Sequence, residues 1–241
     1  MTLADHDIDL IELPPFVADP SALRSEPLSR RLGAGNLAEV DSGALLSFDA
    51  TVPDQGLADV SNSLLFAQLA ADKQAQGRAN ARAWLTAFQG VLSAVGWGQI
   101  GVAIDNQTAK PPVDWKRLVL AQMPDRSVAL ASASIAAAAA MPASSEAMRI
   151  WNDATTMPTA ALFSVGVCRA LAGDPSLDLV TVGCGVNSAA SAFLAWSPDY
   201  SITCCRSRWE LNEDVYAQVR QSIINKLGDR IHQLIAPIPL D

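Results

Sequence analysis

Apolar residues recur at helical spacing between residues 58 and 152. The clearest case is Trp84–Val95, where they repeat every three or four positions until Gly96 ends the pattern. The same period predicts four more helices: Ala58–Gly77, Trp115–Met123, Ser127–Met141 and Ser145–Asn152. One segment interrupts them, because the alternating Ile, Val and Ile of Gln99–Asp105 predict a strand.

After Ala160 the hydrophobic period changes from helical to two, which predicts strands in the last third of the chain. Four segments are expected to be strands: Leu162–Arg169, Leu177–Val186, Phe193–Trp196 and Ser201–Trp209. The first two are joined through Gly173-Asp174-Pro175, residues that favour a turn. We therefore expect an antiparallel β-meander.

A final helix follows the meander. Asn212 is a favourable N-cap, and Glu213 and Asp214 suit the first turn of a helix electrostatically. The expected buried stripe of this helix consists of Val215, Val219, Ile223 and Leu227. Because helices and strands are segregated, the sequence predicts an α+β fold, with a helical N-terminal half packed on an antiparallel β-meander that a C-terminal amphipathic helix closes.

Residues 1–56 differ from the rest of the chain. They are acidic, contain five prolines and show no sustained period. We expect an extended arm over residues 1–56, with partial disorder as the alternative. Residues 57–241 are expected to form a single α+β domain.

The composition narrows the class of partner. Half of the 241 residues are hydrophobic, 17% are charged and the formal net charge is −8. An acidic chain without basic clusters disfavours binding to nucleic acid or to an anionic membrane surface. No apolar run reaches the roughly 18 residues of a membrane span, and the acidic N-terminus is unlike a secretion signal. We expect a cytoplasmic protein whose partner is a hydrophobic small molecule or a lipid; the oligomeric state is left open.

All four cysteines lie in the last third of the chain. Cys168, Cys184, Cys204 and Cys205 form no CxxC pair, and the chain has two histidines. We therefore expect neither a structural zinc site nor a cofactor, unless a fatty acyl group is bound covalently. Motifs for phosphate binding, dinucleotide binding, zinc proteases and serine hydrolases are absent.

Cys168 ends the strand that carries the most informative pattern. Alternation places Phe163, Val165 and Val167 on one side of this strand and Ser164, Gly166 and Cys168 on the other. The second side leaves space beside a thiol, which predicts an apolar ligand pocket with Trp84 and Phe88 in its wall. The alternative is that small side chains let a helix pack closely on the sheet.

Two functions fit such a pocket. The first is binding of a long-chain acyl or other apolar small molecule, with a thioester on Cys168 as its covalent form. The second is an enzyme of cyclase, acyltransferase or hydrolase type acting on a hydrophobic fatty-acyl, polyketide or terpenoid substrate. In that enzyme Cys168 is the nucleophile and His232 its base. A membrane-active toxin is a third hypothesis, which the negative charge disfavours.

Several segments carry a family resemblance. They are Ser61–Leu65, the helix end Gly96-Trp97, the strand Phe163–Cys168, the helix start Val215–Arg220 and Lys226–Gly228. Over roughly Ala58 to Ile235 the chain resembles the Evf virulence-factor family. The resemblance implies a small bacterial α/β protein that carries a palmitoyl group in thioester linkage on a central cysteine, which corresponds to Cys168. The chain departs from the family in its extra cysteines, its alanine-rich helix and its arginines Arg206 and Arg208.

Overall fold

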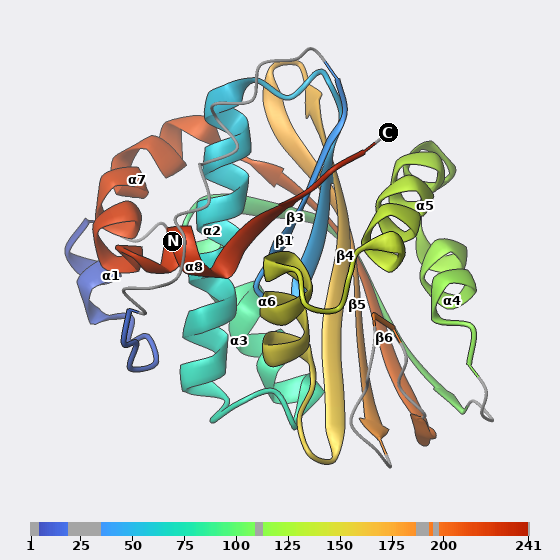
Figure 1. Cartoon of the computed structure of the whole chain (residues 1–241). Coiled ribbons are helices and arrows are strands. Elements are labelled where there is room, and N and C mark those ends of the chain that lie inside the picture. Colours follow the sequence, from blue (N-terminus) through green and yellow to red (C-terminus); the bar gives the residue numbers. More distant parts are fainter. Residues whose placement is uncertain (1–4, 19–34, 109–112, 187–192, 195–197, 241) are drawn as a thin grey trace.

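A seven-stranded sheet forms the centre of the described part of the protein (Figure 1). The computed structural model describes residues 5–18, 35–108, 113–186, 193–194 and 198–240. The strands are, in spatial order, β3 (Trp97–Thr108), β6 (Pro198–Leu211), β5 (Asp174–Val186), β4 (Ala160–Leu171), β2 (Ala44–Phe48), β1 (Leu37–Asp41) and β7 (Ile235–Ile238). Neighbouring strands are antiparallel except β2 and β4, which run parallel.

Helices cover both faces of the sheet (Figure 1). The first helix layer consists of α1 (Asp5–Leu10), α2 (Asp54–Gln74), α3 (Ala81–Ala94), α7 (Glu213–Leu227) and α8 (Arg230–Leu234). The second helix layer, on the other face, consists of α4 (Trp115–Gln122), α5 (Asp125–Ala140) and α6 (Glu146–Thr155). Each layer and the sheet enclose a hydrophobic cluster of buried residues. In the described ranges no helix combines the length and the hydrophobicity of a membrane span.

The α+β class predicted from the sequence is confirmed. The five helices predicted between residues 58 and 152 correspond to α2–α6, and the predicted strand at Gln99–Asp105 lies within β3. The arrangement differs from the prediction, because the helices divide between the two faces of the sheet. Hydrophobic period shows which face of a helix is buried, but it does not show on which side of the sheet that helix lies.

The meander is formed by β4, β5 and β6, which pair in antiparallel register. The separate strand expected at Phe193–Trp196 is wrong where it can be checked. Phe193 and Leu194 form a turn, Trp196 lies outside the described residues, and β6 begins at Pro198. A short apolar run flanked by turn residues is consistent with either structure.

The arm expected over residues 1–56 requires a correction. Residues 37–48 form β1 and β2, which lie inside the sheet, and β2 pairs with the central strand β4. Alternation on β1 sends Ala38 and Val40 toward the second helix layer, which leaves Glu39 and Asp41 facing α2. These two buried carboxylates made the segment resemble a solvent-exposed loop in the sequence.

The C-terminal segment continues beyond the predicted helix. The Asn212 side chain caps α7 by accepting a hydrogen bond from the Val215 N–H group (3.1 Å). Val219, Ile223 and Leu227 are buried on α7 as predicted, whereas Val215 is half-buried and Tyr216 is buried instead. The chain then forms α8 and the strand β7, which pairs with β1 at the edge of the sheet and was not predicted.

Candidate functional site

Cys168 lies on β4 and faces the first helix layer. It has no exposed surface, and its strand neighbours are Phe48 on β2 and Leu177 on β5. Burial raises the pKa of the Cys168 thiol to about 12, with Arg169 opposing this effect. The side chain is therefore a protonated thiol at neutral pH, and a thiol is a much weaker nucleophile than a thiolate.

Leucine side chains occupy the space beside Gly166. A Cβ atom built on Gly166 would lie 2.8 Å from Leu46 Cδ2 and 3.1 Å from the Cδ1 atoms of Leu177 and Leu179. The small residue on β4 is thus matched by large residues on both neighbouring strands. Ser164, the third small residue on this side, shares a buried hydrogen bond of 2.8 Å with the Thr181 hydroxyl.

Helix α3, which carries Trp84 and Phe88, begins at the opposite end of β4 from the thiol. Ala81, at the start of α3, packs closely against Gly183. A Cβ atom added to Gly183 would lie 2.5 Å from the Ala81 Cβ. Gly183 pairs with Leu162 on β4. Leu162 is six residues before Cys168, so the two residues are about 20 Å apart along the strand. Trp84 and Phe88 follow Ala81 on α3 and stack on each other, with ring centroids 4.9 Å apart. They belong to the same hydrophobic cluster as Cys168.

His232 is not brought to Cys168 either. It lies on α8, where the Leu234 carbonyl accepts a hydrogen bond from the Ser42 N–H group beside β1 (2.7 Å). Cys168 pairs with Phe48 at the other end of β2 and lies two strands beyond β1. The register and spacing of the strands place the two residues on the order of 20 Å apart. The geometry therefore does not offer His232 to Cys168 as a base.

The other thiols are also buried. All four cysteines are free, and burial raises the pKa of Cys184 and of Cys204 to about 12 and that of Cys205 to about 11. Cys204 and Cys205 face opposite layers, as the alternation predicts. Among the described residues no group of His, Cys, Asp or Glu side chains is arranged to hold a metal ion.

Two carboxylates on β1, Glu39 and Asp41, are buried beneath α2. Gln68 on α2 accepts a hydrogen bond from the Gly43 N–H group and donates one to the Asp41 carbonyl, both at 3.0 Å. Burial raises the pKa of the Asp41 carboxyl well above its ordinary value; Glu39 raises it further and Arg78 lowers it. This cluster fixes the β1–β2 turn against a helix, so its role is structural.

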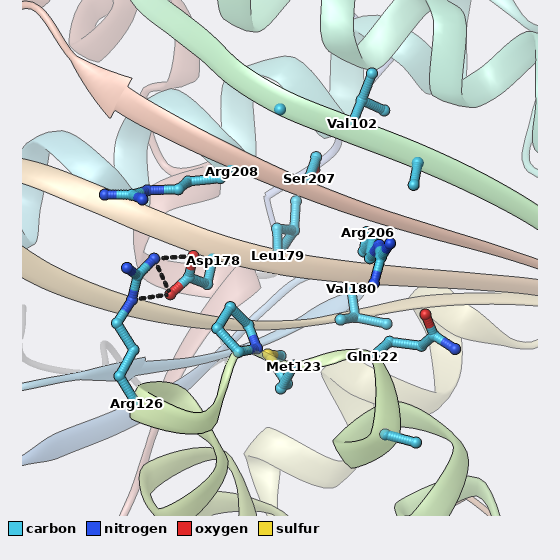
Figure 2. Close-up of a pocket in the computed structure, with 14 residues that line it drawn as sticks. Val102, Gln122, Met123, Arg126, Asp178, Leu179, Val180, Arg206, Ser207 and Arg208 are labelled. Atoms are coloured by element: carbon cyan, nitrogen blue, oxygen red, sulfur yellow. Dashed lines mark hydrogen bonds and ion pairs between the residues drawn. The ribbon is translucent and has the colours of Figure 1, made fainter.

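A groove of about 530 Å³ lies on the opposite face of the sheet from Cys168 (Figure 2). Its floor is formed by two rows of paired residues across β3, β6 and β5. The rows are Ala103–Arg206–Val180 and Gly101–Arg208–Asp178. Val180 belongs to the cluster beneath the second helix layer, so both rows face that layer. The connection between α4 and α5 forms the side wall, with Gln122, Met123 and Pro124.

Ion pairs fix the α5 side of the groove. Arg126 binds the buried Asp178 through Nε and Nη2 at 2.7–3.0 Å, and Ser127 donates a hydrogen bond to the same carboxylate (2.7 Å). Arg169 on β4 donates to the Ser127 hydroxyl (2.8 Å) and to the Arg126 carbonyl. These contacts attach the first turn of α5 to β4 and β5, at the side of the groove.

The sequence pattern did not identify the groove. Its lining comes from β3, the α4–α5 connection, β5 and β6, segments that no periodicity relates to one another. The signal that was present is the pair Arg206 and Arg208, which are charged residues at alternate positions of an otherwise apolar meander. They stood out as departures from the Evf family pattern rather than as site residues.

The comparisons with known proteins add no assignment. No protein-family model matches the chain, and no curated protein matches it significantly. The resemblance to the Evf family therefore stays a prediction, and the function has to be argued from the geometry of the chain itself.

Proposed function

We propose that this protein binds an apolar small molecule, such as a long-chain acyl compound, in the groove between the α4–α5 connection and strands β3, β5 and β6. The groove itself is the observation that carries the proposal. Its volume of about 530 Å³ lies within the roughly 300–1,000 Å³ of small-molecule sites. Its lining is mainly apolar, with Ala103, Met123, Pro124 and Val180, and a few polar groups at fixed positions.

Binding in this groove is non-covalent. Cys168 faces the first helix layer, whereas the groove opens on the other face of the sheet. No cysteine is among the residues that line the groove. The ligand is therefore held by burial of its apolar surface, which contributes about 0.8 kcal/mol for each methylene removed from water.

The proposal is tested with the neutral apolar dye N-phenylnaphthylamine, whose fluorescence rises in an apolar site. Ala103 is half-buried on the groove floor, so Ala103→Trp fills the groove. Ala136→Trp places the same side chain on the exposed face of α5 and serves as the control. We expect saturable dye binding to the wild type and to Ala136→Trp, and its loss in Ala103→Trp. Equal binding to all three proteins would contradict the proposal.

A thioester on Cys168 is a second candidate, and the complete burial of the thiol favours it. Because water is excluded there, a thioester would be protected from hydrolysis, and it would lie beside Phe48 and Leu177, the neighbours of Cys168 on the adjoining strands. The mass of the intact protein before and after hydroxylamine tests this candidate. A mass equal to that of the unmodified chain, unchanged by hydroxylamine, would contradict it.

The enzyme hypothesis has less support. A nucleophilic cysteine needs a lowered pKa or an adjacent base, whereas burial raises the pKa of Cys168 to about 12 and His232 lies at a distance. Binding without turnover is therefore the function that the geometry supports best.

A further inference from the structure

Two arginines of β6, Arg206 and Arg208, lie on the groove floor. Binding of a purely apolar ligand does not explain why charged side chains are present there. Arg206 and Arg208 are two positions apart on one strand, so their side chains leave the same face of the sheet, with Cα atoms about 7 Å apart. Figure 2 shows Arg208 toward the Arg126–Asp178 pair and Arg206 toward Val180 and Gln122.

Neither arginine has the full hydrogen-bonding capacity of its side chain used within the described residues. Arg206 is exposed and makes no hydrogen bond or ion pair with them. Arg208 binds Glu210 through Nη2 at 3.4 Å, but its buried Nε–H group has no acceptor there. A buried donor without an acceptor is unfavourable, and a ligand oxygen in the groove would satisfy it.

The balance of charge in the groove is opposite to that of the whole chain. Among the described residues, three arginines and one aspartate line the groove, although the chain carries a formal net charge of −8. Asp178 is already engaged by Arg126 in a two-point contact. The positive charge of Arg206 is thus left for a ligand.

We infer that the ligand of this groove is an amphiphile with a carboxylate head group, held by Arg206 and Arg208. This inference rests on the proposed function, since the same groove holds the apolar part of the molecule. The planar guanidinium fork matches the two oxygens of a carboxylate. On the edge strand β3, Gly101 pairs with Arg208 and Ala103 pairs with Arg206. Because these two partners are glycine and alanine, little side-chain volume lies beside the arginines. The apolar chain then lies along Val180 and Met123.

The test compares dodecanoate with dodecanol, which differ only in the head group, as competitors for N-phenylnaphthylamine bound to the wild-type protein. We expect dodecanoate to bind about tenfold more tightly, equivalent to about 1.4 kcal/mol. Its affinity should fall as ionic strength rises, because salt screens a partly exposed charge, while the affinity of dodecanol should not fall.

Arg206→Met removes the charge and keeps the apolar part of the side chain. We expect dodecanoate to lose about tenfold in affinity for this variant and dodecanol to lose none. Arg82→Met, at an exposed position on α3, is the matched control and should change neither. Equal affinities of the wild type for the two competitors, without salt dependence, would overturn the inference and leave the apolar site intact. Failure of both competitors and of the dye to bind would refute the proposed function itself.

Discussion

Replacing Gly166 by alanine tests whether the space beside Cys168 is filled. The added Cβ would lie 2.8 Å from Leu46 Cδ2 and 3.1 Å from the Cδ1 atoms of Leu177 and Leu179. All three leucines are buried, so they cannot move without disturbing their own contacts. Overpacking of this kind costs about 2 kcal/mol, and the lower entropy of the unfolded alanine chain offsets roughly 0.5–1 kcal/mol of it. We expect the free energy of unfolding to fall by about 1 kcal/mol.

Gly90→Ala is the matched control for this substitution. Gly90 lies within α3, and apart from its chain neighbours and the backbone of its own helix no atom lies within 4 Å of a Cβ added there. Alanine in place of a helical glycine should raise the free energy of unfolding by about 0.5–1 kcal/mol. Urea unfolding followed by tryptophan fluorescence compares the three midpoints, provided that the dependence on urea is unchanged. If the midpoint of Gly166→Ala equals or exceeds that of the wild type, the leucines do not fill this space and the packing argument is refuted.

Three further predictions concern buried polar groups and thiols. Since burial raises the pKa of Asp41, the folded state holds this proton more tightly than the unfolded state, and stability is lost as pH rises from the unfolded pKa through the folded one. Asp41→Asn should therefore gain stability over the wild type in urea unfolding as pH rises above the ordinary carboxyl pKa of about 4, and a difference that does not change with pH would contradict this. Gln68→Ala leaves the buried Gly43 N–H group and Asp41 carbonyl without their partner, so it should lower the free energy of unfolding by about 2–3 kcal/mol. The exposed Gln74→Ala should change it by less than about 0.5 kcal/mol, and equal effects would refute this role of Gln68. Because burial raises the pKa of Cys168 to about 12, iodoacetamide should modify it at about pH 8 only after unfolding, and rapid labelling of Cys168 in the native protein would show an accessible thiolate.

Local pattern predicted the elements of the fold better than their arrangement. The helical period located α2–α6, and the Asn212 cap located the start of α7, because these signals lie within a few residues of sequence. The period cannot show that α2 and α5 lie on opposite faces of the sheet. Strand β1 escaped notice because Glu39 and Asp41 occupy core positions where an apolar side chain is expected.

The candidate site was less predictable. The sequence placed Ser164, Gly166 and Cys168 on one side of a strand, but it contained no information on which residues of neighbouring strands would fill the space beside Gly166. The groove depends on the register that brings Ala103, Arg206 and Val180 into one row from three distant segments. Arg206 and Arg208 were visible in the sequence as exceptions to an apolar pattern, and the pairing of strands gives them a common location.

A crystal structure of the protein with dodecanoate bearing a terminal bromine tests the central proposal most directly. The anomalous signal of bromine marks the end of the ligand independently of the rest of the density. We predict one bromine site in the groove, with the carboxylate at Arg206 and the chain along Val180 and Met123. A bromine site in the first helix layer beside Cys168, or no ordered ligand in the groove, would contradict the account.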